Sequence, residues 1–260
     1  MRKRPGDEMK IAISQPAYLP WLGYLDLIDQ VDTFVLLDNV QFEKQSWQHR
    51  NRIKTPVGLQ WLTVPVLFRG RFGQEINEVE IRDIEFSRNH LRAIELNYRR
   101  APFFDNYFQD LSARMRTTSS CATLIADLDI RLIEWFMDVL GIQTRLLLSS
   151  RLEQPGRRTE LLANICESLG AKQYLSPLGS SAYLLQEIHV LLEKDLDVAF
   201  QHYEHPQYRQ LFPPFCPYAS ILDLIFNEGE RALEILRGGR RIPFLPDEIS
   251  DMVSVDVGAR

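Results

Sequence analysis

Cysteine is scarce in this sequence. The 260 residues contain three, Cys121, Cys166 and Cys216, which lie far apart and show neither Cys-x-x-Cys nor Cys/His spacing. A small, odd number of scattered cysteines argues against a disulfide framework and against a structural zinc site. We therefore expect reduced thiols in a reducing compartment.

Long apolar runs are also lacking. No segment approaches the ~20 consecutive apolar residues that cross a bilayer. Residues 1–8 carry charges of both signs and precede an apolar run that is too short for the core of a signal peptide. The sequence therefore predicts a cytoplasmic protein without a membrane span, with 1–8 as a flexible N-terminal extension.

The formal charge is −5, from 30 basic and 35 acidic residues, which argues against a general nucleic-acid binder. Hydrophobic residues make up 45% and charged residues 25%, as in ordinary globular proteins. No G-x-S-x-G, Walker loop, H-E-x-x-H or G-x-G-x-x-G pattern occurs, so hydrolase-elbow, P-loop, zincin and ordinary dinucleotide-binding readings have no sequence basis.

Short apolar runs alternate with helical patterns along most of the chain, which favours an α/β fold with a Rossmann-like, mostly parallel sheet. Residues 50–66 flank a Pro56-Val57-Gly58 turn and predict a β-hairpin. The parallel strands are expected near 9–15, 33–38, 144–148, 173–176 and 198–203, and alternation predicts a further strand at 76–82.

Helical spacing of apolar residues predicts a helical insert at about 85–140, packed beside the sheet. We expect one α/β domain over 9–240, followed by a polar tail at 241–260. The helices are expected at about 85–98, 103–115, 121–140, 158–169 and 181–194, with a last one from Ser220, capped together with Asp223, to Gly238.

The loop after the first strand is the first candidate site. Two prolines and a glycine fix its shape, and in open α/β sheets ligands bind beyond the carboxyl ends of the strands. The alternative is that its aromatic residues only pack the following helix onto the sheet. The candidate binding residues of this loop are Gln15, Tyr18, Trp21, Gly23 and Tyr24.

The same loop resembles the nucleotidylyltransferase turn, in which a Pro-containing loop leads to His-x-Gly-His at the start of a helix. Here the matching positions are Trp21-Leu22-Gly23-Tyr24, and both histidines are absent. The resemblance implies a related Rossmann-like fold. Because the groups that would stabilise a pentavalent phosphorus centre are missing, nucleotidyl transfer by an altered site stays an alternative.

The segment 38–54 follows the second strand and should lie over the same edge of the sheet. Its arginines and lysines can hold a phosphate, sulfate or carboxylate, unless it is a solvated basic hairpin. Arg50 and Arg52 should share one face of an extended strand, opposite Asn51. The candidate binding residues here are Asp38, Gln41, Lys44, Arg50, Asn51 and Arg52.

Two later strand-to-helix turns are further candidates. Thr159 follows Gly156-Arg157-Arg158 and either caps a helix or receives an anionic group. Ser176 and Tyr183 lie in a segment of small residues that suits close approach of a ligand, or that forms a plain turn.

Histidines follow the last strand of the predicted sheet. His202 and His205 supply imidazoles that can exchange protons near neutral pH, and His202 is the candidate general base. No further Cys/His cluster supports a metal site, so none is predicted. The sequence indicates no particular cofactor and no oligomeric state.

Several motifs are spread over roughly residues 9–236: QPAYLPWLGYLDLI, FVLLDNVQF, RNRIKT with WLTVPV, LNYRRAPFF, GRRTELLANIC, QYLSPLGSSAYL and SILDLIFNEG. Together they resemble the WbqC-like family. Pro177 stands where the family pattern has glycine. The resemblance implies an association with bacterial O-antigen and other surface-polysaccharide or modified-sugar gene sets.

The expected function is a transferase that attaches an acyl or aminoacyl group to an amino sugar, which is a small-molecule substrate that can be nucleotide-linked or otherwise phosphorylated. The sequence supports it with an aromatic loop able to stack a base or sugar, a basic hairpin able to hold phosphate, and histidines after the last strand able to take a proton from an amine. The alternatives are a nucleotidyltransferase-like enzyme and a non-catalytic ligand-binding or scaffold protein.

Overall fold

A five-stranded parallel sheet forms the centre of the protein. The computed structural model describes residues 8–116 and 124–249, so Cys121 and the start of the helix expected at 121 lie outside the described residues. The strand order is β5-β2-β1-β6-β7. The strands are β1 (Lys10–Ser14), β2 (Thr33–Leu36), β5 (Arg145–Leu148), β6 (Gln173–Ser176) and β7 (Asp197–Phe200). The prediction of a Rossmann-like parallel sheet is confirmed.

Helices cover both faces of the sheet, which is why its strands are continuous apolar runs. In β1, Ala12 packs into one hydrophobic cluster, whereas Ile11 and Ile13 pack into the other. The chain leaves β1 in one direction to reach β2 and β5, and it later returns on the other side of β1 to form β6 and β7. The gap between β1 and β6 is therefore the topological switch point, where such sheets bind ligands.

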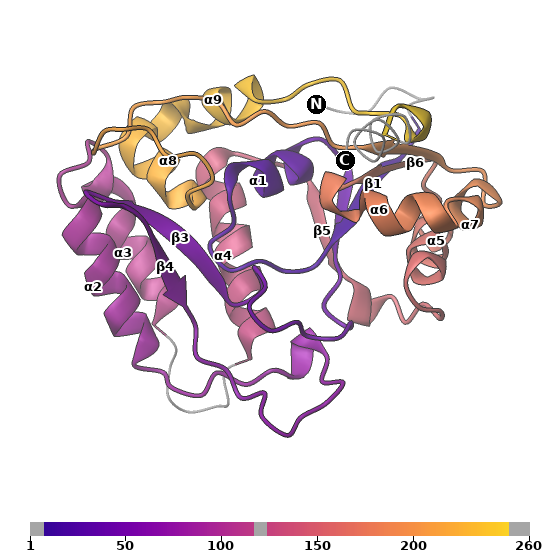
Figure 1. Cartoon of the computed structure of the whole chain (residues 1–260), viewed down its shortest axis with the longest axis horizontal. Coiled ribbons are helices and arrows are strands. Elements are labelled where there is room, and N and C mark those ends of the chain that lie inside the picture. Colours follow the sequence, from indigo (N-terminus) through magenta and orange to yellow (C-terminus); the bar gives the residue numbers. More distant parts are fainter. Residues whose placement is uncertain (1–7, 117–123, 250–260) are drawn as a thin grey trace, which may run out of the picture.

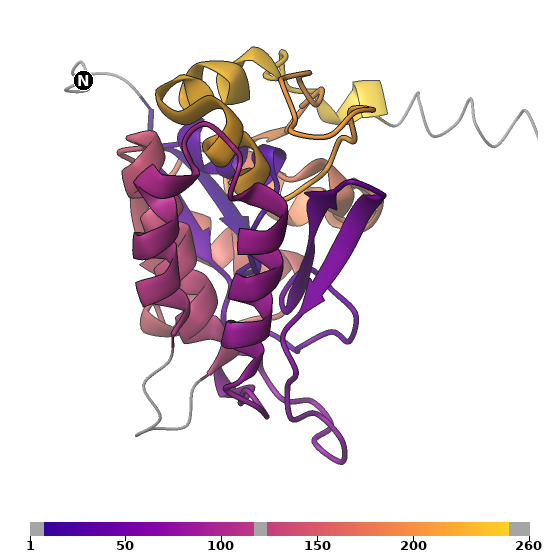
Figure 2. The same cartoon turned by 90° about the vertical axis from the view of Figure 1, so that its left-hand side faces the viewer.

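The predicted hairpin and helical insert are both present. Strands β3 (Arg50–Thr55) and β4 (Gly58–Thr63) form a separate antiparallel pair in which Arg52 lies opposite Trp61. In Figure 1 the hairpin lies with α2 and α3 on one side of the molecule, while α5 and α7 lie on the other; Figure 2 shows the insert helices side by side. The insert helices are α2 (Phe86–Tyr98), α3 (Phe104–Met115) and α4 (Ile125–Leu140).

The remaining helices are shorter than expected. The helix predicted at 181–194 is interrupted, and the last helix breaks at Gly229. Ser220 Oγ accepts a hydrogen bond from Leu222 N at 3.3 Å and so caps its helix, whereas the Asp223 carboxylate turns away to bind Tyr208. These helices are α1 (Leu22–Asp29), α5 (Thr159–Ser168), α6 (Ser181–Leu184), α7 (His189–Leu192), α8 (Ile221–Glu228) and α9 (Ala232–Gly238). None of the described helices is long and apolar enough to cross a membrane.

The strand predicted at 76–82 is wrong. The side chains of Glu75 and Glu78 form a reciprocal capping box that closes a 3-10 turn at Ile76–Glu78. The residues after the turn make only isolated bridges, Ile81 with Val66 and Glu80 with Leu124. The alternating pattern reflects buried residues on either side of a turn, so the period of two was present without a strand.

Residues 241–249 were expected to belong to a polar tail. Instead, Phe244 pairs with Phe200 at the end of β7, with N to O distances of 2.8 and 2.9 Å. Ile249 is buried in the cluster beneath this strand. The segment therefore covers the outer end of β7, and its Phe244 ring stacks on the neighbouring His202.

Candidate functional site

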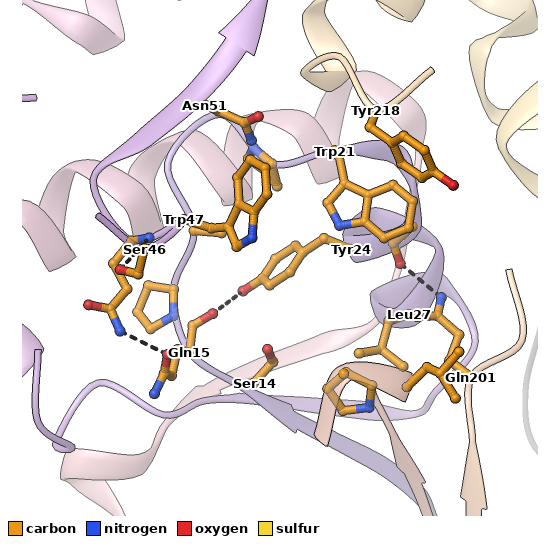
Figure 3. Close-up of a pocket in the computed structure, with 18 of the residues that line it drawn as sticks. Ser14, Gln15, Trp21, Tyr24, Leu27, Ser46, Trp47, Asn51, Gln201 and Tyr218 are labelled. Atoms are coloured by element: carbon orange, nitrogen blue, oxygen red, sulfur yellow. Dashed lines mark hydrogen bonds between the residues drawn. The ribbon is translucent and has the colours of Figure 1, made fainter. Parts of the chain in front are cut away.

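A cavity of about 610 Å³ opens at the carboxyl end of β1, at the switch point. We call it the first cavity. Its lining comes from the loop after β1, the segment before the hairpin, and the turns after β6 and β7, and Figure 3 shows their side chains gathered around one hollow. Its main lining residues are Ser14, Gln15, Trp21, Gly23, Tyr24, Glu43, Trp47, Gln48, Asn51, Pro177, Gly179, Gln201, Tyr203 and Tyr218.

The loop after β1 is held in one shape by hydrogen bonds. Tyr24 Oη donates to Gln15 O at 2.9 Å, and Asn51 Nδ2 donates to Leu19 O at 2.8 Å and to Tyr18 O at 3.2 Å. Leu19 has a φ of 44°, a conformation that a non-glycine residue keeps only when its surroundings enforce it. Tyr18 itself is fully buried and hydrogen-bonded to His90 at 2.8 Å, so its role here is packing.

Aromatic rings form one wall of the first cavity. Trp21 lies 5.7 Å from Tyr203 and 5.6 Å from Tyr218 between ring centroids. A Cβ atom at Gly23 would lie 2.2 Å from the Trp21 ring, so only glycine lets the indole lie flat over the first turn of α1. Burial raises the pKa of Tyr24 and of Tyr203 above the usual tyrosine value, so both phenols stay neutral. Rings of this kind suit a sugar or a base.

A second cavity of about 830 Å³ lies over the carboxyl ends of β2 and β5. Arg157 and Arg158 line it just before α5. The guanidinium of Arg158 lies 5.8 Å from the centre of the Tyr183 ring and 3.3 Å from a carboxylate oxygen of Glu187. Its main lining residues are Gln15, Leu37, Asn39, Gln41, Glu43, Glu75, Gln154, Gly156, Arg157, Arg158 and Tyr183.

Gln15 and Glu43 line both cavities. The orientation of the Gln15 amide follows from its neighbours. The backbone N–H of Glu43 donates to Gln48 Oε1 at 3.1 Å, so the other atom of that amide is the Nε2 donor, and it donates to Gln15 Oε1 at 2.8 Å. The Nε2 group of Gln15 makes no hydrogen bond to the described residues, so it is free to donate to a ligand where the cavities meet.

The sequence did not single out Glu43. The signal available was an acidic side chain between the apolar Phe42 and the basic Lys44, in a segment rich in lysine and arginine. Its exposed carboxylate has no ion pair among the described residues. An acceptor without a partner at the junction of two cavities can bind an ammonium group or take a proton.

Several predicted binding residues have structural partners instead. The Asp38 carboxylate accepts from Ser150 N at 2.9 Å and from Ser150 Oγ at 2.6 Å, which ties the end of β2 to the end of β5. Thr159 is buried and donates to Glu187 at 2.5 Å rather than capping α5. Ser176 is fully buried and donates to Pro177 O.

Gln41 and Tyr183 line the second cavity, whereas Lys44 lies in a third hollow. The Lys44 ammonium is 4.8 Å from the centre of the Phe68 ring. Those predicted residues that do line a hollow are thus distributed over two cavities and a third hollow, instead of one shared pocket.

Arg50 and Arg52 point to the same face of β3, as expected, and Asn51 points to the loop on the other face. The guanidinium carbons lie 4.4 and 5.3 Å from the centre of the Trp61 ring. Neither arginine lines the two cavities. Arg52 lies 5.6 Å from the centre of the Trp47 ring, which lines the first cavity, and Arg50 lies over the neighbouring Trp61.

The two histidines after β7 are placed differently. His202 stacks on Phe244, with 4.1 Å between ring centroids, and does not line the first cavity, whereas its neighbours Gln201 and Tyr203 do. The His205 ring stacks against Trp21 with 6.5 Å between ring centroids, and its Nδ1 is hydrogen-bonded to Pro206 O. Burial lowers the pKa of His205, so it is neutral near pH 7. Among the described residues, no group of three His, Cys, Asp or Glu side chains is placed to hold a metal ion.

Replacing Asn51 with alanine should lower the free energy of unfolding by about 1 to 3 kcal/mol, because two buried carbonyls lose their hydrogen-bond donor. The loop should also lose its fixed shape, so ligand affinity at the first cavity should fall. Urea unfolding followed by fluorescence measures the first effect. Asn89→Ala, on the exposed side of α2, is the control and should change stability by less than about 0.5 kcal/mol. Equal stability of the two variants would contradict this account of the loop.

Comparison with known proteins places the chain among relatives of unestablished role. A Mycobacterium tuberculosis (strain ATCC 25618 / H37Rv) protein described as uncharacterized protein Rv1507c is 41% identical over 229 residues, which cover 88% of this chain and 97% of the relative. No solved structure gave a significant match. The family model of the WbqC-like protein family matches residues 15–235, which include the loop after β1, both cavities and the hairpin. The chain therefore belongs to the WbqC-like protein family.

Proposed function

We propose that this protein is a transferase that attaches an acyl or aminoacyl group to a nucleotide-linked amino sugar in the synthesis of bacterial surface polysaccharides or modified sugars. The observation that carries the proposal is the meeting of two cavities at Gln15 and Glu43. Group transfer between two substrates needs adjoining sites, with the reacting atoms at their boundary.

The first cavity suits the amino sugar because sugar rings pack on the faces of aromatic side chains, here Trp21 and Trp47. The second cavity suits the acyl donor, whose anionic end would lie near Arg157 and Arg158. The sugar amine and the donor carbonyl then meet between Glu43 and Gln15.

The chemistry requires no cofactor in this arrangement. The amine nitrogen attacks the carbonyl carbon of a thioester or ester donor, and Glu43 takes the proton that the amine releases. Gln15 Nε2 donates a hydrogen bond to the oxyanion that forms. Collapse of this intermediate breaks the bond to sulfur or oxygen, the leaving group departs with the electron pair, and an amide remains on the sugar.

Acyl transfer fits the residues of the loop better than nucleotidyl transfer does. Trp21 and Tyr24 occupy the positions at which the nucleotidylyltransferase turn has histidines, and both line the first cavity. Neither ring supplies the positive charge that a pentavalent phosphorus centre needs. An amide-forming reaction needs a base and an oxyanion donor, which the junction supplies.

The test combines equilibrium binding with mass spectrometry. The purified chain is mixed with nucleotide-linked amino sugars and with acyl-coenzyme A or aminoacyl ester donors, and the sugar is analysed for the mass of the added group. We expect one donor and acceptor pair to give the acylated sugar at a rate that depends on the protein concentration. Binding of the sugar without product from any donor would overturn the proposal and favour a scaffold. The proposal places the reaction in the cytoplasm, where thiols stay reduced.

A further inference from the structure

Two arginines and two tryptophans form a continuous surface on the open face of the hairpin. Trp47 and Trp61 are 5.5 Å apart between ring centroids, with an angle of 35° between the rings. The guanidinium carbon of Arg50 lies over Trp61 at 4.4 Å, and that of Arg52 lies between the two rings, at 5.6 and 5.3 Å. We call these four residues the Arg-Trp platform.

The platform combines exposed apolar surface with two half-buried positive charges. Trp47 is 48% exposed and Trp61 is 43% exposed, which is unusual for the largest side chain. Neither Arg50 nor Arg52 has a carboxylate within ion-pair distance among residues 8–116 and 124–249. The Nε atom of each is buried and has no hydrogen-bond partner there, so a ligand would meet the terminal nitrogens of the guanidinium groups. By contrast, Arg237 and Arg240 both pair with Asp29. Two uncompensated charges beside two exposed indoles favour an anionic ligand that also has a flat ring.

The platform adjoins the first cavity. Trp47 belongs to both, because it lines the cavity and contacts Trp61. Arg52 Nη2 donates to the carbonyl of Tyr218 at 3.3 Å, and the side chain of Tyr218 lines the opposite rim of the cavity. The platform therefore continues the lining of the first cavity outward from Trp47.

We propose that the Arg-Trp platform binds the nucleoside diphosphate part of a nucleotide sugar whose amino sugar occupies the first cavity. This inference rests on the proposed function and adds where each half of the acceptor lies. The diphosphate bridge carries two negative charges, which match the two guanidinium groups, and arginine binds phosphate oxygens with paired donors. The base stacks on an indole face, which accepts any base.

The test measures binding of uridine diphosphate to the full-length chain by calorimetry, with uridine and free glucosamine as partial ligands. We expect uridine diphosphate to bind more tightly than either. Arg50→Ala and Arg52→Ala should each weaken uridine diphosphate about tenfold to a hundredfold, the loss expected for one charged hydrogen bond. Raising the salt concentration should weaken the binding of uridine diphosphate to the native protein more than its binding to the double variant.

Trp61→Ala should weaken both uridine diphosphate and uridine about tenfold, with little dependence on salt, because the loss is stacking. Arg50→Lys keeps the charge without the planar donor pair, so its affinity for uridine diphosphate should lie between those of the native protein and of Arg50→Ala. All of these side chains are exposed or half-buried, and circular dichroism checks that each variant folds. Arg88→Ala is the control, since Arg88 is exposed on α2 and pairs with Glu85.

Unchanged affinity for uridine diphosphate in the Arg50, Arg52 double variant would overturn the inference. So would tighter binding of an acidic oligosaccharide than of uridine diphosphate in the native protein, because that result would assign the platform to a glycan. The two proposals fail in different ways. Loss of nucleotide binding in the variants, without acylated product from any donor, refutes only the transferase. If an amino sugar that lacks the nucleotide is acylated as fast as the nucleotide-linked one, only the platform is refuted.

Discussion

Glu43→Gln should lower the rate of acyl transfer by about 10² to 10⁴, the usual contribution of a positioned base. Glutamine keeps the shape of the side chain at the junction of the two cavities but cannot take the proton of the amine. The separate affinities for the amino sugar and for the donor should change much less, because each cavity has many other lining residues. Single-turnover kinetics with the identified donor measure the first quantity, and calorimetry measures the second.

Glu78→Gln is the matched control. Glu78 lines neither cavity, and its carboxylate accepts from Glu75 N at 3.1 Å in the capping box, where a glutamine oxygen can still accept. We expect this variant to keep the rate within about threefold of the native protein, since a charge away from the reacting atoms contributes little. Equal rates for Glu43→Gln and the native protein would remove Glu43 from the mechanism.

The sheet could be predicted because each parallel strand is a short run of apolar residues on both faces, bounded by turns. The common face of Arg50 and Arg52 followed from the period of two, once 50–55 was assigned as a strand. The strand expected at 76–82 failed for the opposite reason. There the alternation came from Ile76, Val79 and Ile81, whose burial is fixed by a turn and by contacts with the insert.

The division into two cavities could not be predicted from the sequence. It depends on the strand order, which puts β5 beside β2 and puts β6 on the far side of β1. Gly156 to Arg158 therefore lie on one side of Gln15, and Pro177 to Gly179 lie on the other. Local patterns carry no information on which later strand lies next to which earlier one.

The residues after β7 show how a shift of one position changes which side chains reach the candidate site. Phe200 packs into the cluster on one face of the sheet, and His202, two residues later, continues on that side and meets Phe244. Gln201 and Tyr203 take the other side and line the first cavity. Side chains alternate along an extended chain, so the face to which Phe200 belongs decides which of the following residues face the ligand. Because β7 has apolar residues on both faces, the sequence did not reveal which face that is.

Gln201 also connects the wall of the first cavity to a buried carboxylate of α1. Its Nε2 atom donates to Gly23 O at 2.8 Å and to the Asp26 carboxylate at 2.9 Å. Asp26 has no exposed surface, and Arg240 Nε donates to its other oxygen at 2.9 Å. Arg240 also pairs with Asp29, which Arg237 holds with two bonds of 2.8 Å.

Arg240→Ala should lower the free energy of unfolding by about 3 to 5 kcal/mol near pH 7, because it leaves the buried Asp26 carboxylate without its counter-charge. Arg237→Ala is the control. It removes a half-exposed partner of Asp29 and leaves Asp26 untouched, so its cost should be about 1 kcal/mol. Urea unfolding of both variants and the native protein measures the difference, and a loss below about 1 kcal/mol for Arg240→Ala would contradict this account.

The pH dependence follows from the two carboxylates. Burial raises the pKa of Asp26 although Arg240 opposes it, so its ionised form costs stability as pH rises, and more so without Arg240. Burial also pushes the pKa of Asp29 upward, but its bonds to Arg237 and Arg240 outweigh burial and hold that pKa below the usual value. The stability that Asp29 contributes is therefore present above the ordinary aspartate value of about 3.9 and is lost as pH falls through its lower folded pKa. The Asp26 effect makes the deficit of Arg240→Ala largest near neutral pH and smaller toward pH ~4, because protonation relieves the unpaired carboxylate. The share of the deficit that comes from Asp29 shrinks only below that range. A deficit that stays constant from neutral pH down to that range would show that Arg240 acts through packing alone.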